Sequence, residues 1–366
     1  MMQTMIGKRL HIEQPGKGER YMVTIQDIAE IAGVSKATVS RVINRTGYVN
    51  EKTRERVQAV IDQYHYSPSA SAVNLSRRET NTIGVIVPEI ANTFFGELLH
   101  GIGEVIDQTD FTSFYFDSDN NSDKEERAIL ALEQQRVRGL LITPAQDSDA
   151  AVNRRLYSYL ERLNVPTVVV DRDFPGSKWD GVFFENYQSG YCAAEALIAA
   201  GNRTLGMITG DLRLKIARER YEGFLQAAQD GGCPVSEQHI YQGDFTIEGA
   251  YAAAKRMLES DDRPQAVLTS NNLTSLGFLK AVTEKGMQIG RDIAVIGIDH
   301  IPELDILNYG FSCVARDTVQ MGRLAMQVLL ERMQNPDKQR QICMIPHRLI
   351  LKGSEKMDNP FFCPDV

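Results

Sequence analysis

Short apolar runs alternate with longer amphipathic segments through most of this 366-residue chain. The runs are TIGVIV, TSFYF, GLLIT and PTVVVD, then, after a connecting segment at 182–186, TLGMIT, AVLTS and IAVIGID. Strands this uniformly apolar are buried on both faces, and the segments between them can provide the helical crossovers that parallel strands require. The pattern predicts an α/β fold with two doubly wound lobes that enclose a cleft.

Polar and aromatic side chains follow several of these predicted strands. Asp171 ends PTVVVD, Asn271 and Asn272 follow AVLTS, and Asp299 ends IAVIGID, while Phe94 and Phe95 follow the first strand. Ligands of open α/β sheets bind beyond the carboxyl ends of the strands, so these residues are candidate ligand contacts. Carboxylates and amides can hold hydroxyls while rings cover C–H faces, which favours a polyhydroxylated ligand. The alternatives are core positions for the phenylalanines and helix caps for the aspartates.

A different pattern precedes these predicted strands. We call the part of the chain that contains the strands the body and the part before it the head. The segment TIQDIAEIAGVSKATVSRVIN, 24–44, predicts two short amphipathic helices, with Thr24 and Ser35 as caps and Gly33 at the turn between them. A third helix, capped by Asn50, can cover the first two. The spacing suits a helix-turn-helix, but a capped helical hairpin without DNA function has the same local signals.

Charge is distributed unevenly along the chain. The formal net charge is -8, so the whole protein presents no basic field to nucleic acid. Residues 22–79 hold eight basic and six acidic residues, whereas the chain after Glu79 carries a net charge of -12. Any DNA-binding function must therefore lie in the head.

The head and the segment after it resemble a known family. The run 24–44, then Tyr66-Ser67-Pro68-Ser69-Ala70 and the stretch ending in Leu75, are similar to the head and hinge of the lactose-repressor/galactose-repressor (LacI/GalR) family of bacterial transcription regulators. The similarity continues to about Gly353. It implies a helix-turn-helix DNA-binding domain at 22–67, a hinge helix and linker at 68–80, an effector-binding and dimerisation domain at 81–353, and a tail at 354–366. It further implies a first lobe at about 81–182 and 315–343 and a second lobe at about 183–314 and 344–353.

The resemblance assigns DNA contacts residue by residue. Lys36 and Ala37 match the residues that choose operator bases, and Arg41 matches a base contact. Ala37 can offer only apolar contact, so Lys36 and Arg41 would supply the polar readout. Leu75 matches a wedge inserted into the minor groove, with Arg77 beside it as a phosphate contact; the alternative is an ordinary linker leucine. Positioning contacts or caps complete the DNA-binding set: Thr24, Ser35, Thr38, Ser40 and Asn44.

The resemblance also assigns the effector pocket. Asn92, Phe94 and Phe95 match the wall of the first lobe, and Asp171 matches its hydroxyl-binding aspartate. The second lobe contributes an effector-binding arginine, an aromatic that stacks on the ligand and two polar residues, which match Arg220, Phe245, Asn271 and Asp299. Arg220 could instead pair with a carboxylate on the lobe surface. Ile216 departs from the family pattern, which has a small polar residue there, so we expect the shape of the pocket to differ at this position.

Together these features predict a sequence-specific, DNA-binding transcriptional regulator. We expect a cytoplasmic homodimer that binds palindromic operator DNA, represses carbohydrate-utilisation genes and responds to a small-molecule effector, a sugar or sugar derivative. A non-sugar effector such as a purine or nucleoside is the alternative. The tail lacks a leucine heptad, so tetramers are not expected.

Other classes of function have weaker support. Gly101-Ile102-Gly103 lies inside a helical pattern and lacks the third glycine of a dinucleotide site, and neither a P-loop nor a nucleophile elbow is present. We expect no catalytic residues, no metal and no cofactor. The body alone would suit a sugar-binding transport protein, but a head is present and no secretion signal is seen. No apolar run approaches the length of a membrane span.

The first 21 residues carry no periodic apolar pattern and several helix breakers. We interpret them as a disordered extension or as a misassigned start. The second interpretation is suggested by Lys17-Gly18-Glu19, which can be encoded by a purine-rich stretch, like a ribosome-binding site, a few codons before Met22. We expect translation to begin at Met22. The intact mass of the protein made from its native gene tests this, and a mass that includes 1–21 contradicts it.

Overall fold

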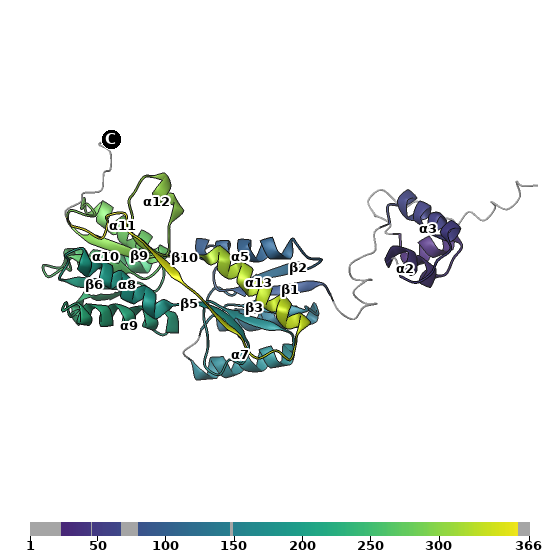
Figure 1. The fold of residues 1–366 in the computed structure, drawn as a ribbon, viewed down its shortest axis with the longest axis horizontal. Coiled ribbons are helices and arrows are strands. Elements are labelled where there is room, and N and C mark those ends of the chain that lie inside the picture. Colours follow the sequence, from purple (N-terminus) through teal and green to yellow (C-terminus); the bar gives the residue numbers. More distant parts are fainter. Residues whose placement is uncertain (1–22, 45, 67–79, 147–148, 358–366) are drawn as a thin grey trace, which may run out of the picture. The chain divides into compact units, whose positions relative to one another are not determined.

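The computed structural model describes residues 23–44, 46–66, 80–146 and 149–357. The chain divides between Glu79 and Thr80 into two compact units, a helical head and an α/β body, shown in Figure 1. Each unit is described by itself. The expected hinge, with Leu75 and Arg77, lies outside the described residues.

In the described part of the head, three helices pack around a small apolar core. They are α1 (Ile25–Ala32), α2 (Lys36–Asn44) and α3 (Glu51–Gln63). Thr24 forms a capping box with Asp27, and the Asn50 side chain accepts a hydrogen bond at the start of α3. Gly33 ends α1 at φ 61°, a left-handed conformation that glycine adopts without steric cost. The predicted helix faces meet in the core, which contains Ile28, Ala29, Ala32, Val39, Val42, Val49, Val57 and Val60.

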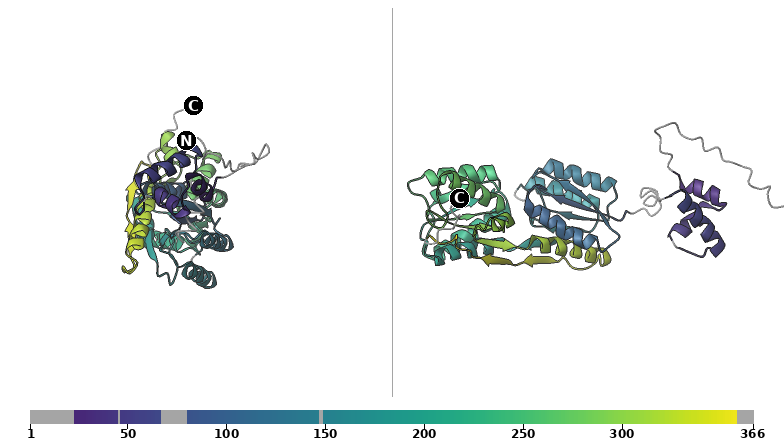
Figure 2. Two further views of the ribbon diagram at one scale, coloured as in Figure 1. Left: turned by 90° about the vertical axis from the view of Figure 1, so that its right-hand side faces the viewer. Right: turned by 90° about the horizontal axis from the view of Figure 1, so that it is seen from above.

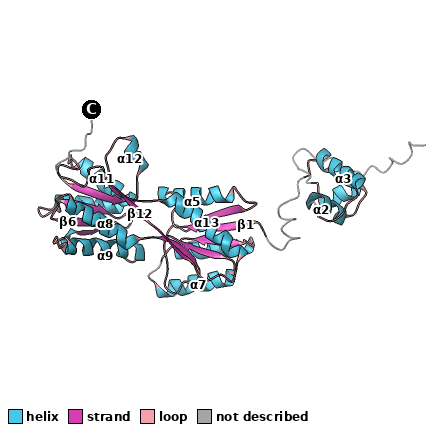
Figure 3. Cartoon of the chain, viewed as in Figure 1, coloured by secondary structure: helices cyan, strands magenta, loops and turns pink. Residues whose placement is uncertain are grey.

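The first lobe of the body is a six-stranded parallel sheet with helices on both faces (Figure 3). Its strand order is β11-β5-β4-β3-β1-β2. Helices α5 (Thr93–Ile106) and α13 (Thr318–Gln334) cover one face, and α6 (Ser122–Gln134) and α7 (Ala150–Leu163) cover the other. The strands are β1 (Thr82–Val87), β2 (Thr112–Asp117), β3 (Gly139–Ile142), β4 (Thr167–Val170), β5 (Asp180–Phe184) and β11 (Ile342–Ile345).

The second lobe repeats this architecture, with the order β12-β10-β9-β8-β6-β7. Helices α8 (Asn186–Ala199) and α9 (Lys215–Asp230) pack on one face, and α10 (Ile247–Glu259) and α11 (Asn272–Glu284) on the other. The remaining elements are β6 (Leu205–Thr209), β7 (Ile240–Gln242), β8 (Ala266–Thr269), β9 (Ala294–Ile298), β10 (Cys313–Arg316), β12 (His347–Ile350), the short helix η1 (Glu237–His239) and α12 (Pro302–Ile306). Only β12 runs antiparallel to its neighbour, β10. The predicted pair of doubly wound lobes is confirmed. In the described part of the chain, no helix is both long and apolar enough to cross a bilayer.

The chain passes between the lobes three times, after Phe184, after Arg316 and between Ile345 and His347. Figure 2 shows the late strands and α13, in yellow-green, along one side of both lobes. These crossings fall about two residues later than the expected boundaries at 182, 314 and 343, because each strand extends its pairing to the edge of its own sheet.

Two expectations at the lobe edges were wrong. The supposed connecting segment at 182–186 contributes to β5, a strand paired between β4 and β11, because its apolar residues complete the first sheet. The supposed tail from 354 begins inside the second lobe. Ser354 is buried and its hydroxyl donates to the Val295 carbonyl oxygen at 2.7 Å, while Glu355 accepts from the Ser312 hydroxyl.

Glycines allow the closest helix contact in the first lobe. A Cβ atom built on Gly101 would lie 2.0 Å from the Val319 carbonyl oxygen, and one on Gly322 would lie 2.1 Å from the Leu98 carbonyl oxygen. Helices α5 and α13 therefore touch backbone to backbone. The Gly101-Ile102-Gly103 sequence serves this contact through its first glycine, since a Cβ on Gly103 would meet nothing within 4 Å.

The two glycines of this motif should respond oppositely to alanine. Gly101→Ala should destabilise the body by about 1–3 kcal/mol, because the added methyl overpacks the α5–α13 contact. Gly103→Ala should stabilise it by about 0.5–1 kcal/mol, the usual gain for a helix interior. Urea unfolding followed by circular dichroism measures both, and equal effects would contradict the packing role of Gly101.

Candidate functional site

Helix α2 presents one exposed polar face. Lys36, Ala37 and Arg41 are exposed on it, while Val39 and Val42 point into the head core. The spacing of the three exposed residues places them on one side of the helix, with Lys36 and Ala37 at its amino-terminal end and Arg41 in its last turn. In helix-turn-helix proteins, the amino-terminal residues of the recognition helix contact base edges in the major groove.

The other predicted head residues lie at the helix ends or beside this face. The Thr24 side chain is engaged with Asp27 in the α1 capping box. The Ser35 hydroxyl accepts from the Thr38 backbone N–H at 3.2 Å and contacts the Thr38 hydroxyl at 3.0 Å, so it caps α2. Ser40 is half-buried on α2, and Asn44 is the last residue of that helix.

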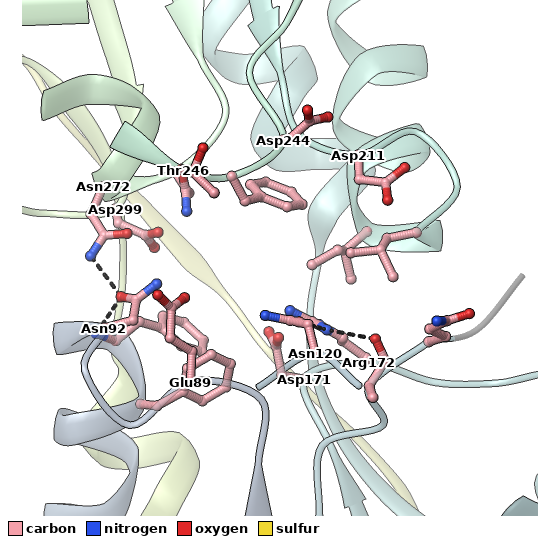
Figure 4. Close-up of a pocket in the computed structure, with 18 of the residues that line it drawn as sticks. Glu89, Asn92, Asn120, Asp171, Arg172, Asp211, Asp244, Thr246, Asn272 and Asp299 are labelled. Atoms are coloured by element: carbon pink, nitrogen blue, oxygen red, sulfur yellow. Dashed lines mark hydrogen bonds between the residues drawn. The ribbon is translucent and has the colours of Figure 1, made fainter. Parts of the chain in front are cut away.

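A cavity of about 550 Å³ lies between the two lobes of the body. All eight predicted effector residues line it: Asn92, Phe94, Phe95, Asp171, Arg220, Phe245, Asn271 and Asp299. In Figure 4, Asp211, Asp244 and Thr246 of the second lobe face Glu89, Asn120 and Arg172 of the first. The size is that of ordinary small-molecule sites.

The two aspartates are buried and do not act as helix caps. Asp171 and Asp299 are 4% and 6% exposed and have φ angles of 62° and 76°. Phe245, which belongs to the second lobe like Asp299, also has a positive φ, 60°. Non-glycine residues in this region carry backbone strain, which the surrounding structure must offset and which concentrates at functional sites. The sharp turn after each strand aims the carboxylates at the cleft.

Arg220 lies beneath the cleft with neutral partners only. Its Nε donates to the Asn186 Oδ1 at 2.9 Å and its Nη1 donates to the Ser270 carbonyl oxygen at 2.7 Å. Its guanidinium carbon is 5.6 Å from the centre of the Phe245 ring, within cation–π range. Burial, followed by the nearby positive charge of Arg316, lowers the pKa of Arg220 to about 9. The surface ion pair considered from the sequence is therefore absent.

The amides of the cleft combine capping with a contact between lobes. Asn92 caps α5 and Asn271 caps α11, each through its side-chain oxygen. Asn272 of the second lobe donates to the Asn92 Oδ1 and the Thr93 Oγ1, both at 2.9 Å. In Figure 4, one of the dashed lines joins Asn272 to Asn92.

The aromatic and apolar walls differ between the lobes. Phe94 and Phe95 belong to the core of the first lobe and also line the cavity. In the second lobe, Leu214 and Ile216 pack with Phe245 in a small apolar cluster. Ile216 is buried at the cavity wall and adds an apolar group to it.

A buried carboxyl supports the floor of the first lobe. Arg172 Nη1 donates to the Asn120 Oδ1 at 2.8 Å and to the Ala145 carbonyl oxygen at 3.2 Å. The Ala145 N–H donates to Glu125 Oε1 at 2.8 Å. Burial raises the pKa of Glu125 to about 7, against the opposing effects of that hydrogen bond and of Arg172. Within the described residues, no cluster of His, Cys, Asp and Glu could hold a metal ion.

Glu125 should make the body less stable as the pH rises. Its folded pKa lies above the unfolded value of 4.5, so its contribution is complete below about pH 4.5 and is lost as the pH passes through 7. Glu125→Gln keeps an acceptor for Ala145 without the charge. The variant should match the parent near pH 4.5 and exceed it at pH 8.5 by an amount of the order of 3 kcal/mol. Urea unfolding at both pH values measures this, and parallel pH profiles would contradict it.

Further residues line the cavity beside the eight predicted effector contacts, among them Arg172, Asn272 and Arg316. The strand-end rule also selects Asn272, which follows AVLTS, and it could have included Arg172, which directly follows Asp171. Arg316 ends β10, a strand that was not predicted, and the same rule would have selected it.

Comparison with known proteins agrees with this geometry. Residues 24–69 match the family described as bacterial regulatory proteins, lacI family, and residues 80–352 match the periplasmic binding proteins and sugar binding domain of the LacI family. A curated relative is the HTH-type transcriptional repressor PurR of Proteus mirabilis (strain HI4320), 33% identical over 342 residues, which cover 93% of this chain and 98% of the relative. PurR of Mannheimia succiniciproducens is 30% identical over 92% of this chain and 99% of its own length.

Solved structures give the same result. The Lac repressor dimer bound to operator and the anti-inducer ONPF has a TM-score of 0.79 and 25% identity, covering 91% of this chain and 99% of that one. A complex of the transcriptional regulator CelR with cellobiose has a TM-score of 0.68 and 26% identity over the same shares. The chain therefore belongs to the lacI family of bacterial regulatory proteins, and it is a DNA-binding transcription regulator with an effector-binding domain.

Proposed function

We propose that this regulator is a homodimeric repressor of carbohydrate-utilisation genes whose cleft binds a sugar or sugar derivative. The main support for the sugar ligand is the cleft, where buried carboxylates, arginines and amides lie beside phenylalanine rings. Such groups can bond several hydroxyls while a ring covers the C–H face of the ligand. The cellobiose complex of CelR supports a carbohydrate, and the repressor names of the relatives support repression.

A purine or nucleoside remains the second candidate effector. The relatives named PurR favour it, and so does the apolar wall of Leu214, Ile216 and Phe245, which could cover a planar base. The two candidate ligands require different groups in the cleft. A base requires a flat apolar contact, whereas a sugar requires many hydrogen-bonding groups.

For the head, we propose that Lys36 and Arg41 read base edges, that Ala37 makes apolar contact, and that five neighbours position the helix on phosphates. The five are Thr24, Ser35, Thr38, Ser40 and Asn44. The exposed face of α2 supports the first part, because Lys36, Ala37 and Arg41 share it. Leu75 and Arg77 keep their proposed roles in the minor groove and on phosphate.

Dimerisation is proposed for two reasons. One head reads only a half-site, so a palindromic operator requires a symmetric pair, as in the operator complex of the Lac repressor dimer. The body also exposes apolar side chains, with Ile306 and Leu307 79% and 72% exposed at the end of α12. Exposed apolar groups that lie together mark interaction surfaces.

The base-reading role of Arg41 is testable on operator selected from random DNA by this protein. Arg41→Ala should lose about 1–3 kcal/mol of operator affinity while binding to random DNA changes little. Arg56→Ala, a control at an exposed position of α3, should leave both affinities unchanged. Gel-shift titrations measure this, and an equal loss on random DNA would make Arg41 a phosphate contact.

The effector can be found by a thermal-shift screen of D-glucose, D-galactose, D-ribose, D-gluconate, cellobiose, hypoxanthine and adenosine, since a specific ligand raises the melting temperature. The compound that binds is then added to an operator titration. Phe245→Leu should keep operator affinity without effector and weaken the effector response about tenfold, because the aromatic face is lost. Binding by purines alone would refute the carbohydrate proposal, and a full response in the variant would remove Phe245 from the site.

A further inference from the structure

Arg316 joins the lobes at the floor of the cleft. It is the last residue of β10 in the second lobe, and its side chain is 2% exposed. Its Nε donates to Asp299 Oδ1 at 2.7 Å, and its Nη2 lies 2.6 Å from the same oxygen in an ion pair. The guanidinium also stacks on two rings of the first lobe, 4.8 Å from the centre of Phe94 and 4.9 Å from that of Phe184. One side chain is thus bonded in its own lobe and packed in the other.

The third nitrogen of Arg316 faces the carboxylate of the first lobe. Its Nη1 lies 3.9 Å from Asp171 Oδ1, and both atoms are buried without a hydrogen-bond partner. The separation is too long for a hydrogen bond, but opposite charges at this distance attract appreciably when water is excluded. Arg316 therefore interacts with a carboxylate from each lobe.

A second contact reinforces the same junction. Asn272 of the second lobe donates to Asn92 and Thr93 of the first, as described above. Phe94, Asn272, Asp299 and Arg316 line the effector cavity and also a second cavity of about 730 Å³. These four residues therefore form the partition between the two cavities, and they come from both lobes.

We propose that Arg316 is a positioning residue that holds Asp171 and Asp299 in place and keeps the cleft closed before any effector binds. The effector then enters a cleft that the chain has already closed on itself. The effector can shift the equilibrium between open and closed lobes only by a difference in interaction energy. That difference is between its own bonds to the two carboxylates and the bonds that Arg316 already makes. This inference goes beyond the proposed function, because it holds whichever effector the cleft accepts.

Removal of the guanidinium should open the cleft. Arg316→Gln leaves Asp299 without its buried partner, and an unpaired buried charge favours any motion that returns it to water. Arg316→Lys keeps a positive charge between the carboxylates and should retain the closed form. Arg213→Gln is the matched control, since Arg213 also lines the cavity but bonds only to Asp211 within its own lobe.

The experiment is single-molecule energy transfer on the full-length protein without effector. Dyes are placed at Ser158→Cys on α7 and Glu222→Cys on α9, exposed positions in different lobes, with Cys192, Cys343 and Cys363 replaced by serine. Excess unlabelled chain ensures that each assembly contains one labelled copy. Melting temperature is recorded for every variant.

The parent, Arg316→Lys and Arg213→Gln should give one narrow high-transfer population. Arg316→Gln should raise the ratio of open to closed molecules by about tenfold or more, given the cost of an unpaired buried charge. A broad distribution in the parent would overturn the proposal. So would an unchanged distribution in Arg316→Gln, even with a lowered melting temperature, because Arg316 would then only support the fold.

Discussion

Parallel strands end at one edge of their sheet, and the function of the body depends on that constraint. Both sheets are almost entirely parallel, and the three crossings join them so that their carboxyl ends border one cavity. Asp171, Asp299 and Arg316 each lie at or directly after such an end. The central strands can therefore be largely apolar while the cleft at their carboxyl ends is strongly polar. Packing and recognition are thereby separated in the sequence.

The cleft is held in shape largely by charge. Buried ions are costly unless they are paired or well hydrogen-bonded, and the cleft satisfies this condition unevenly. Asp299 is paired with Arg316, and Arg220 is bonded to an amide and a carbonyl. Asp171 has one oxygen without a partner. A site with one unsatisfied carboxylate oxygen and three buried arginines is prepared for a ligand that both donates and accepts hydrogen bonds, which suits hydroxyl groups.

Local chemistry made much of this structure predictable. Capping by Thr24, Ser35 and Asn50 depends on neighbours in sequence, and the central strands can be recognised in the sequence by their apolar runs. Strands β7, β10 and β12 are three or four residues long and mix polar with apolar side chains, so no periodicity marks them. Strand β11 is apolar but only four residues long. Arg316 was overlooked with β10. The bond from Asn272 to Asn92 joins residues 180 positions apart, which no local pattern can reveal.

The late crossings also set an order for folding during synthesis. The helices of the head end at Gln63, so this unit can fold while most of the chain is still unmade. Neither lobe can complete its fold so early. The first sheet is incomplete until β11 is synthesised and the second until β12 is synthesised. Ser354 and Glu355, which pack in the second lobe, follow later still. Between these moments the emerging protein has a folded head and incomplete lobes. The DNA-reading part therefore exists for a time without the domain that controls it.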